Sequence, residues 1–385
     1  MIIYSVCILF LSYICLDLII SFIVYPLKKG MNYYLIKKKF SCYKFDKNIG
    51  YTMSPNLKYS NPNKPPLNAP RKIIFVDLRT DQNGFLFTDN LETEKKNNKI
   101  IFCLGGSTTA GFECAHDRHY PAQLDTLIKP RGYRCVNAGL GGARSIHELL
   151  LLKYKLLPHK PHAIILFSGY NDYESFGYKI HQPYNPYVHY LSNVINNNQI
   201  VDLLDYSVIF HEIKKKLYQF RFNLVRKTFY KKKNRRSEVK KEKSSMWDLD
   251  DLTWLNEWKN NVNDMIQICK KNQIKFFILN TISPVYKKAG NDAKLFSDID
   301  LQMDGRFDKW VEFLDLIEEN YQSICKNNNV SFLDVNPFFE EYLSDYHGED
   351  YYKKRFSLFT DRMHFSELGN KLLANAIYQL IDNEL

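Results

Sequence analysis

The sequence predicts an α/β protein with a parallel sheet of about five strands and helices packed on both of its faces. Two observations support this. From about residue 99 on, short apolar segments of strand length alternate with longer segments in which apolar residues have helical spacing, and this alternation is typical of parallel sheets. In addition, three short polar strings with reactive side chains follow predicted strands, which is where such sheets bind their ligands.

The first half of the predicted sheet contains three strands and two helices. Strands are expected at Lys99–Leu104, Arg134–Ala138 and Ala163–Phe167, which are short and apolar. The helix expected at Pro121–Lys129 begins with a proline, a residue that the first turn of a helix accepts. The helix expected at Ser145–Leu157 begins with a serine that we expect to cap it, with a glutamate three residues later.

The alternation resumes after an interruption at about residues 173–245. Because five strands are enough for one sheet, residues 99–385 are expected to form one domain that carries the interruption as an insertion. No internal repeat is present. The elements expected after the interruption are Leu252–Lys271, Arg306–Lys326 and Ser366–Ile381 as helices, and Ile274–Asn280 and Val330–Val335 as strands.

Residues 1–27 are expected to form a single-pass transmembrane helix that anchors the chain. The segment has no lysine or arginine, one acidic residue, Asp17, and an almost continuous run of apolar side chains. About 20 such residues cross a bilayer as a helix, and the segment lacks the basic start and small-residue cleavage site of a signal peptide. A buried core helix is the alternative. Lysines follow the segment rather than precede it, which favours a cytoplasmic location for the rest of the chain.

Residues 28–98 are expected to connect the anchor to the main domain. They are rich in Asn, Pro, Lys and Tyr, and the five prolines of Ser54–Pro70 disfavour regular structure there. The apolar runs Lys72–Asp77 and Gly84–Phe87 are candidates for a small hairpin packed on the main domain.

The net charge of +11 is a local feature of the insertion. Residues Lys214–Lys243 hold 14 Lys and Arg and only two acids, a balance of +12, so the remaining chain sums to about −1. This run lacks a recognised nucleic-acid-binding motif, and no nucleic acid partner is expected. Apolar residues of helical spacing here fit a helix on an anionic membrane surface and, equally well, a helix docked on its own domain. They are Ile209, Ile213, Leu217, Phe220 and Leu224.

Ser107 is the candidate nucleophile. It follows Gly105 and Gly106 at the end of the first predicted strand, where glycines let the backbone bend sharply and let a substrate approach the hydroxyl. A serine at a strand–helix junction is more often a helix cap, and its hydroxyl is a weak nucleophile unless a base removes its proton. The string is not a phosphate-binding loop, because no Gly-Lys-Ser/Thr follows at the required spacing.

Asp361 and His364 supply a candidate base. On a turn, a carboxylate three residues before a histidine can hold one ring nitrogen while the other nitrogen faces the serine. The same spacing also occurs at the start of surface helices, but here it precedes the C-terminal amphipathic segment and so occupies a loop at the sheet edge. His116 and His119 are the next candidates, although both follow Ser107 too closely in sequence to reach back to it easily.

Three hydrogen-bond donors are candidates to stabilise the negative charge that develops on the substrate oxygen. They are the backbone N–H groups of Ser107 and Gly142 and the side-chain amide of Asn171, and each follows a predicted strand. Donors fixed around the oxygen of an attacked ester lower the barrier to its cleavage. Gly-Gly and Asn-Asp are also common turn pairs, so it is the combination with a nucleophile and a base that predicts a serine esterase.

These strings resemble the sequence blocks of the SGNH (GDSL-type) hydrolases. Gly105–Thr109 resembles the first block, in the variant where Gly-Ser-Thr replaces Asp-Ser-Leu, and Asn137–Gly142 resembles the second. Ser168–Asp172 resembles the third block and Asp361–His364 the last. The resemblance implies a flavodoxin-like three-layer α/β/α sandwich that hydrolyses or transfers an acyl ester.

The resemblance also implies a role for each candidate residue. Ser107 would be the nucleophile, His364 the base and Asp361 its orienting partner, while Ser107, Gly142 and Asn171 would form the oxyanion hole. No cofactor or metal ion is expected. The expected substrate is a small-molecule, saccharide or lipid ester near the membrane. The alternatives are an O-acyltransferase and a membrane-tethered binding protein that keeps the fold without the activity.

Overall fold

The computed structural model comprises two compact units. Residues 1–54 and 184–242 belong to one unit, and residues 55–183 and 243–385 belong to the other. Only part of each unit is described. The described residues are 42–60, 77–86, 99–177, 252–285 and 307–385, together with six residues among the first nineteen.

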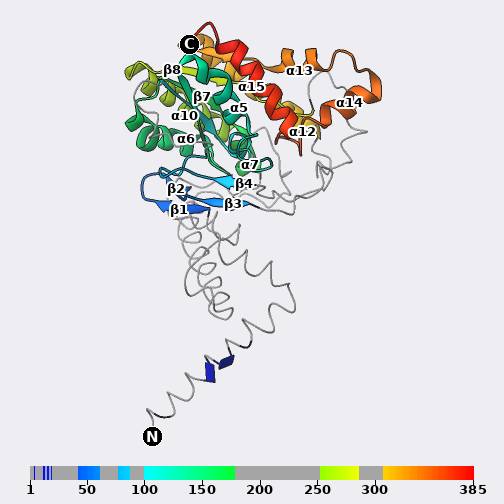
Figure 1. Ribbon diagram of the computed structural model, residues 1–385. Helices are drawn as coiled ribbons and strands as arrows, with labels where there is room; N and C mark the ends of the chain where they lie inside the picture. The colour runs from blue at the N-terminus through cyan, green and yellow to red at the C-terminus, as the bar shows by residue number, and fades with distance from the viewer. Residues whose placement is uncertain are drawn as a thin grey trace, which may run out of the picture. The chain divides into compact units, whose positions relative to one another are not determined.

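The larger unit is built on a parallel sheet of five strands, as predicted (Figure 1). The strand order is β6-β5-β7-β8-β9, and every neighbouring pair is parallel. Numbered within this sheet alone, the order is 2-1-3-4-5, which is the doubly wound order of flavodoxin. The strands are β5 (Lys99–Gly105), β6 (Tyr133–Gly139), β7 (Ala163–Phe167), β8 (Lys275–Leu279) and β9 (Ser331–Leu333).

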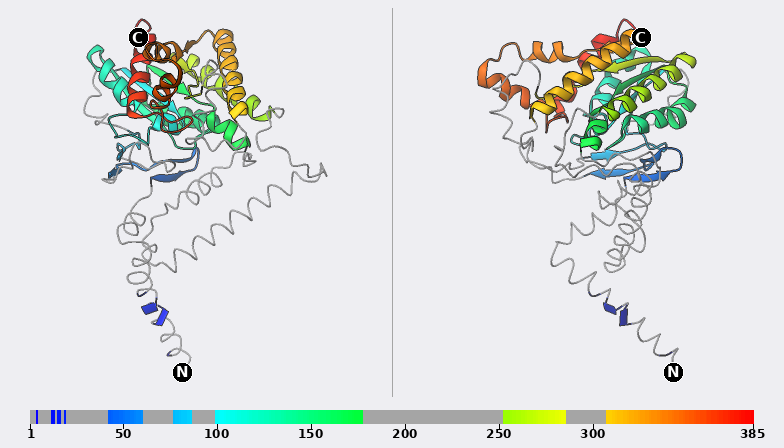
Figure 2. Two further views of the ribbon diagram at one scale, coloured as in Figure 1. Left: turned by 90° about the vertical axis from the view of Figure 1, so that its right-hand side faces the viewer. Right: turned by 180° about the vertical axis from the view of Figure 1, so that it is seen from behind.

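Helices cover both faces of this sheet (Figures 1 and 2). Helices α5 and α15 pack against each other on one face, and α10 packs against α6 and α12 on the other. With the exception of α6, these helices and all five strands end within two residues of their predicted bounds. The helices are α5 (Tyr120–Ile128), α6 (Ser145–Leu151), α10 (Thr253–Lys271), α12 (Phe307–Asn328) and α15 (Glu367–Ile381).

The helix predicted at Ser145–Leu157 differs from expectation in two ways. Its α-helical part, α6, ends at Leu151, and the chain continues as a π-helical turn. Its N-cap residue is Arg144 rather than Ser145. The hydroxyl of Ser145 donates instead to a carboxylate oxygen of Asp172 at 2.6 Å, because an ionised acceptor makes a stronger hydrogen bond than a neutral one.

The smaller unit contributes an antiparallel hairpin that the sequence did not predict. Strands β1 (Tyr43–Asp46) and β2 (Gly50–Met53) pair along their full length. The carboxylate of Asp46 accepts the backbone N–H groups of Asn48 and Ile49, at 2.8 and 3.0 Å, and so closes the turn between the strands.

In the larger unit, the expectation of no regular structure over Ser54–Pro70 was wrong for three residues. Strand β3 (Lys58–Ser60) pairs with β4 (Asp77–Arg79), a partner that its own local sequence cannot reveal. The first run of the candidate hairpin, residues 72–77, lies almost entirely outside the described residues. From the second run, Leu86 forms single antiparallel bridges with Thr80 and with Asn137 of β6.

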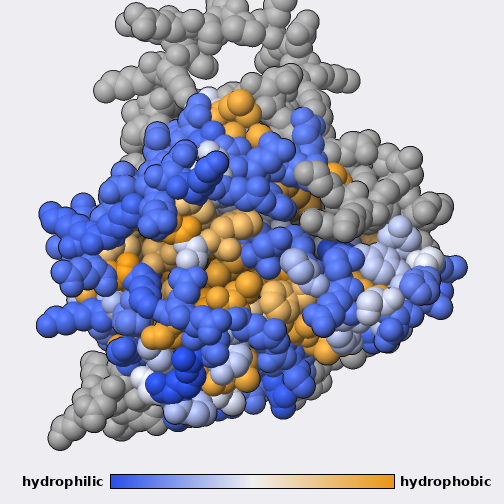
Figure 3. Space-filling model, turned by 90° about the horizontal axis from the view of Figure 1, so that it is seen from above, coloured by the Kyte–Doolittle hydropathy of each residue, from blue (hydrophilic) through white to orange (hydrophobic). Residues whose placement is uncertain are grey.

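The sheet forms the core of the larger unit. Every residue of β6 and β7 is buried, while hydrophilic residues cover much of the surface seen from above in Figure 3, with apolar residues between them. The first residues of β6 and β8, Tyr133 and Lys275, bond to the carbonyls of Leu385 and Glu384. The last residues of the chain therefore lie at the amino edge of the sheet, opposite the edge where the polar strings begin.

The predicted anchor lies mostly, and the basic run wholly, outside the described residues. No helix among the described residues is long and apolar enough to cross a membrane. Most of residues 1–27 and all of residues 178–251, which include Lys214–Lys243, lie outside the described part of the chain. Both remain sequence predictions.

Candidate active site

The carboxyl ends of three neighbouring strands bring together the strings that contain Ser107, Gly142 and Asn171. The string Asp361–His364 was also expected to follow a strand, but it follows the helix α14 (Gly348–Phe356) instead. Gly105 at the end of β5 lies opposite Gly139 of β6 on one side and Phe167 of β7 on the other. The segments that follow these three residues therefore start at the same edge of the sheet, as expected for a ligand site in a doubly wound fold.

Ser107 begins the short helix α4 (Ser107–Ala110), with Gly106 as its N-cap residue. Two close contacts explain the paired glycines before it. A Cβ atom on Gly105 would lie 2.4 Å from the carbonyl oxygen of Phe167, and a Cβ atom on Gly106 would lie 2.6 Å from Nδ2 of Asn171. The absence of side chains thus lets the asparagine amide lie directly beside the residue that precedes the serine.

His364 lies in a segment without helix or strand, residues Ser357–Ser366, between α14 (Gly348–Phe356) and α15. Oδ1 of Asp361 accepts the backbone N–H groups of Met363 and His364, each at 2.8 Å. These two bonds fold the chain into a tight turn. The aspartate consequently holds the backbone of the histidine as well as its ring.

Ser107, His364 and Asp361 form a row of two hydrogen bonds. Oγ of Ser107 lies 2.8 Å from Nε2 of His364, and Nδ1 of His364 lies 2.6 Å from Oδ2 of Asp361. Burial lowers the pKa of His364, but the charges of Asp361 and Glu113 outweigh it and raise the pKa to about 9. Burial raises the pKa of Asp361, but His364 and the backbone donors more than offset this and hold the pKa below its usual value.

Asn171 is fixed beside this row, near the start of α7 (Tyr170–Gly177). Its Nδ2 donates to the carbonyl oxygen of Ala143 at 2.8 Å. An amide nitrogen carries two hydrogens, so the second remains for another acceptor. Gly142 precedes Ala143 with φ of +71°, a conformation that favours glycine.

A small polar cavity adjoins Ser107. Asn171 lines this cavity, whereas Gly142 does not. The carboxylate of Glu148 is buried in its wall, and burial raises the pKa of Glu148 well above its usual value. The lining residues are Gly106, Ser107, Thr108, Ala143, Glu148, Phe167, Ser168, Gly169, Tyr170, Asn171 and Met363.

Asp172 is a supporting residue to which the sequence assigned no separate role. It follows Asn171, and besides the Ser145 hydroxyl it accepts the Ser145 backbone N–H at 3.0 Å. These bonds tie the start of α7 to the start of α6, and hence to the turn that contains Gly142 and Ala143. The sequence did contain a signal for this contact. Ser145 stands at the start of a helix and Asp172 follows the third strand of the sheet, and both positions lie at the same edge of the sheet.

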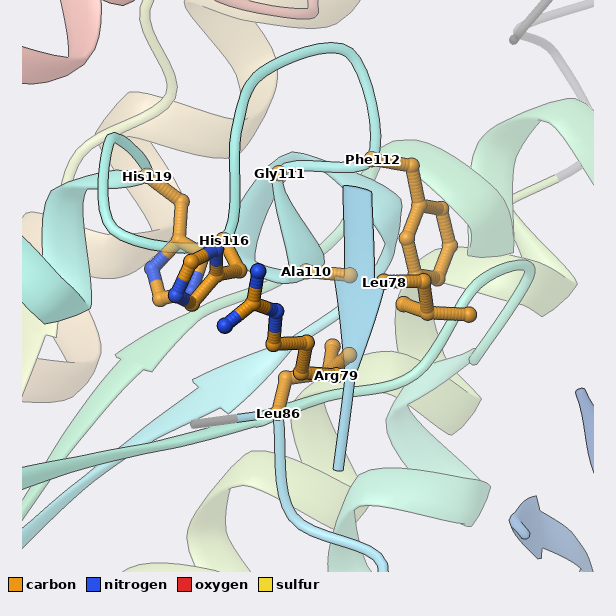
Figure 4. Close-up of a pocket in the computed structure, with 8 residues that line it drawn as sticks. All are labelled: Leu78, Arg79, Leu86, Ala110, Gly111, Phe112, His116 and His119. Atoms are coloured by element: carbon orange, nitrogen blue, oxygen red, sulfur yellow. The ribbon is translucent and has the colours of Figure 1, made fainter. Parts of the chain in front are cut away.

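The other histidines considered in the sequence occupy a different pocket. His116 and His119 line it together with Arg79 and Phe112 (Figure 4). Nδ1 of His119 accepts the backbone N–H of Ala122 at 3.1 Å and so caps α5. Burial and the neighbouring His116 lower the pKa of His119 to about 3, which keeps the ring neutral.

Glu113 is a residue that the sequence reasoning missed. Its Oε1 lies 3.7 Å from Nε2 of His364, the same nitrogen that faces Ser107. Nothing in the sequence marks it except its position six residues after the serine. Its neighbour His364 lies far along the chain, so only the fold could identify the contact.

The geometry suits attack of a hydroxyl on a carbonyl carbon. The serine hydroxyl contacts a base, the base contacts a carboxylate, and an amide donor lies nearby to receive negative charge. Among the described residues, no group of three or more His, Cys, Asp or Glu could hold a metal ion.

One comparison with known proteins, the match to a family model, agrees with this chemistry. A model of the GDSL-like lipase/acylhydrolase family matches residues 103–372. No curated protein matches the sequence.

Solved structures similar to this chain include two acetyl xylan esterases and a lipase. One is an acetyl xylan esterase with 16% identity, covering 73% of this chain and 98% of that chain, with a TM-score of 0.41. Another, from Geobacillus stearothermophilus, has 15% identity, coverage of 74% and 94%, and a TM-score of 0.41. A GDSL-like lipase from Bacteroides thetaiotaomicron has 13% identity, coverage of 78% and 93%, and a TM-score of 0.37.

Proposed function

Because the chain belongs to the GDSL-like lipase/acylhydrolase family and is a hydrolase acting on ester bonds, we propose that Ser107, His364 and Asp361 carry out this hydrolysis. Ser107 is the nucleophile, His364 the general base and Asp361 the carboxylate that orients the ring. The observation that supports these roles most directly is the row of two hydrogen bonds, 2.8 Å from Oγ to Nε2 and 2.6 Å from Nδ1 to Oδ2.

The proposed reaction has two steps. Oγ of Ser107 bonds to the ester carbonyl carbon while Nε2 of His364 takes its proton, and the imidazolium then gives that proton to the departing alcohol oxygen. Water repeats the sequence on the acyl-enzyme and releases the acid. Asp361 accepts from Nδ1 throughout and stabilises the charged ring.

The proposed oxyanion hole consists of the backbone N–H groups of Ser107 and Gly142 and the side chain of Asn171. The amide of Asn171 is supported most strongly, because its bond to Ala143 fixes it beside Gly106 while one hydrogen remains for the substrate oxygen. The positive φ of Gly142 is compatible with an N–H group turned toward a ligand.

The Ser107→Ala variant tests the nucleophile. In the full-length chain we expect hydrolysis of p-nitrophenyl acetate to fall by about 10⁴-fold or more, because the attacking atom is absent. A fluorophosphonate probe should label the wild-type chain and not the variant, since only an activated serine reacts. Equal rates for the two proteins would contradict the proposal.

For the substrate, we infer an O-acylated saccharide or lipid at a membrane surface. The support is the apolar run of residues 1–27, which would confine a hydrolase of residues 99–385 to that surface through the connector of residues 28–98. The lysines after the run favour the cytoplasmic side. Rates on p-nitrophenyl esters of increasing chain length, compared with acetylated polysaccharides, would separate lipid from saccharide esters.

Membrane attachment is tested separately. The full-length chain should remain with membranes after alkaline carbonate extraction, whereas a variant without residues 2–27 should be released. Release of both chains would exclude the anchor without affecting the proposed reaction.

A further inference from the structure

A second carboxylate faces the imidazole of His364, on the side away from Asp361. Oε1 of Glu113 lies 3.7 Å from Nε2, whereas Asp361 contacts Nδ1. The ring is therefore flanked by an acidic side chain at each of its nitrogens. The nitrogen near Glu113 is also the one that lies 2.8 Å from Oγ of Ser107.

The fold brings Glu113 to this position through the loop after α4. Gly111 ends that helix with φ of +66°, and a Cβ atom there would lie 2.4 Å from Cβ of His119. Only glycine allows this turn, which is seen with His119 and Phe112 in Figure 4. The turn directs the next residues back toward the segment that contains His364.

Besides the ring of His364, the charge of Glu113 is compensated by a hydrogen bond from its own backbone. Its Oε1 is buried and has no hydrogen-bond partner among the described residues, and an unpaired buried acceptor is costly. Burial accordingly raises the pKa of Glu113, while the charge of His364 lowers it. A charged imidazole at 3.7 Å thus stabilises the ionised carboxylate more than the backbone hydrogen bond does.

We propose that Glu113 is a positioning residue that sets the protonation state of His364 and stabilises its charged form during the reaction. This inference rests on the proposed role of His364 as the base. Glu113 exchanges no proton with the substrate and forms no covalent bond. It acts through the ring, on the nitrogen that receives the proton of the serine hydroxyl.

The charges around His364 determine the expected pH dependence. Asp361 and Glu113 favour the imidazolium, Arg362 on the same segment disfavours it, and the neutral hydroxyl of Ser107 faces Nε2. With both carboxylates in place, the pKa of His364 lies at about 9. The base of the free enzyme is therefore largely protonated at neutral pH and becomes available as the pH rises.

The experiment compares the pH profiles of kcat/KM for the full-length wild type, E113Q and E113D on p-nitrophenyl acetate, with buffer hydrolysis subtracted. E113Q removes an opposite charge beside His364 and should lower the pKa of that residue. The acidic limb of its profile should therefore lie about one pH unit or more below that of wild type. E113Q should then be faster than wild type near pH 7 and slower on the alkaline plateau. E113D keeps the charge at a shorter reach, so its limb should lie between the two.

Controls separate this role from a packing role and from the proposed function itself. E341Q removes an exposed carboxylate and should leave the limb unchanged. An E113Q limb equal to that of wild type, or an equal loss at every pH, would overturn the inference. If E113Q does not fold, the inference is tested by the acidic limb of the E113D profile. An E113D limb at the pH of the wild-type limb would overturn the inference in the same way. Activity that persists in Ser107→Ala would instead overturn the proposed function.

Discussion

Ser107 and His364 lie 2.8 Å apart, yet a sheet holds one of them, whereas a single antiparallel bridge and individual hydrogen bonds hold the other. One residue separates Ser107 from the end of β5, and β5 pairs with a strand on each side. His364 lies in the segment Ser357–Ser366, where Oγ of Ser366 donates to the carbonyl of Ser357 at 2.8 Å. The sheet thus fixes the proposed nucleophile, whereas the position of the proposed base depends on a few specific contacts.

Two neighbours of the histidine segment supply many of these contacts. The carbonyl of Leu358 would lie 1.9 Å from a Cβ atom on Gly369, so α15 approaches the segment as closely as glycine allows. Arg355 is fully buried and donates to the carbonyls of Ser283 and Pro284, at 3.0 Å each. Ser283 in turn donates from its hydroxyl to the carbonyl of Arg362, the residue after Asp361.

The largest effect on the histidine side is expected from His364→Ala. It should lower kcat by about 10⁴-fold, because the serine then has no base. Combined with Ser107→Ala it should cause little further loss, since the two residues act as one unit. The measurement is the rate of the single and double variants. Multiplicative losses would mean that the two sides work independently.

The next largest effect is expected from Arg355→Met, which tests whether the histidine side depends on few contacts. Loss of the buried guanidinium should lower the free energy of unfolding by about 3 kcal/mol, because its partners lose their donors. Arg134→Met is the matched control, since Arg134 forms a buried pair with Asp125 at 3.0 Å on α5. Denaturant unfolding should show similar destabilisation in both variants.

Only Arg355→Met should also lower kcat under conditions where both variants are folded. If Arg134→Met lowers kcat equally, the histidine segment is no more dependent on local contacts than the rest of the fold.

A smaller effect is expected on the serine side from Gly106→Ala. The new methyl group meets Nδ2 of Asn171, so the amide must move, and loss of an oxyanion donor should lower kcat by about 10²-fold. The free energy of unfolding should fall by only about 1 kcal/mol. In a double variant with Asn171→Ala the two losses should not add, because both act on the same donor. Additive losses in kcat would mean that the methyl group acts through a contact other than the one with Asn171.

The same contrast explains which features could be predicted from sequence. The strands are local apolar runs, so β5 and β7 were found within one residue of their ends, and the strings after them contain Ser107 and Asn171. Features that depend on a distant partner were missed or misassigned. Strand β3 forms only by pairing with β4, and Glu113 could be identified only from its contact with His364.

Ser145 shows the limit within a single residue. Its position at the start of α6 was correct, but its hydroxyl binds a carboxylate from α7 rather than the helix backbone. The local sequence pattern predicted where Ser145 lies, whereas tertiary contacts determine which group its hydroxyl binds.

The separation of 257 residues between the serine and its histidine has a consequence for biosynthesis. During synthesis, the proposed nucleophile and the strands β5, β6 and β7 are made long before the proposed base. The nascent chain therefore passes through a period in which Ser107 is present without its proposed base. That period ends when α15 docks on α5, where the side chain of Asn370 accepts the backbone N–H of Tyr120 at 2.9 Å, because the proposed base on the preceding segment then lies beside Ser107.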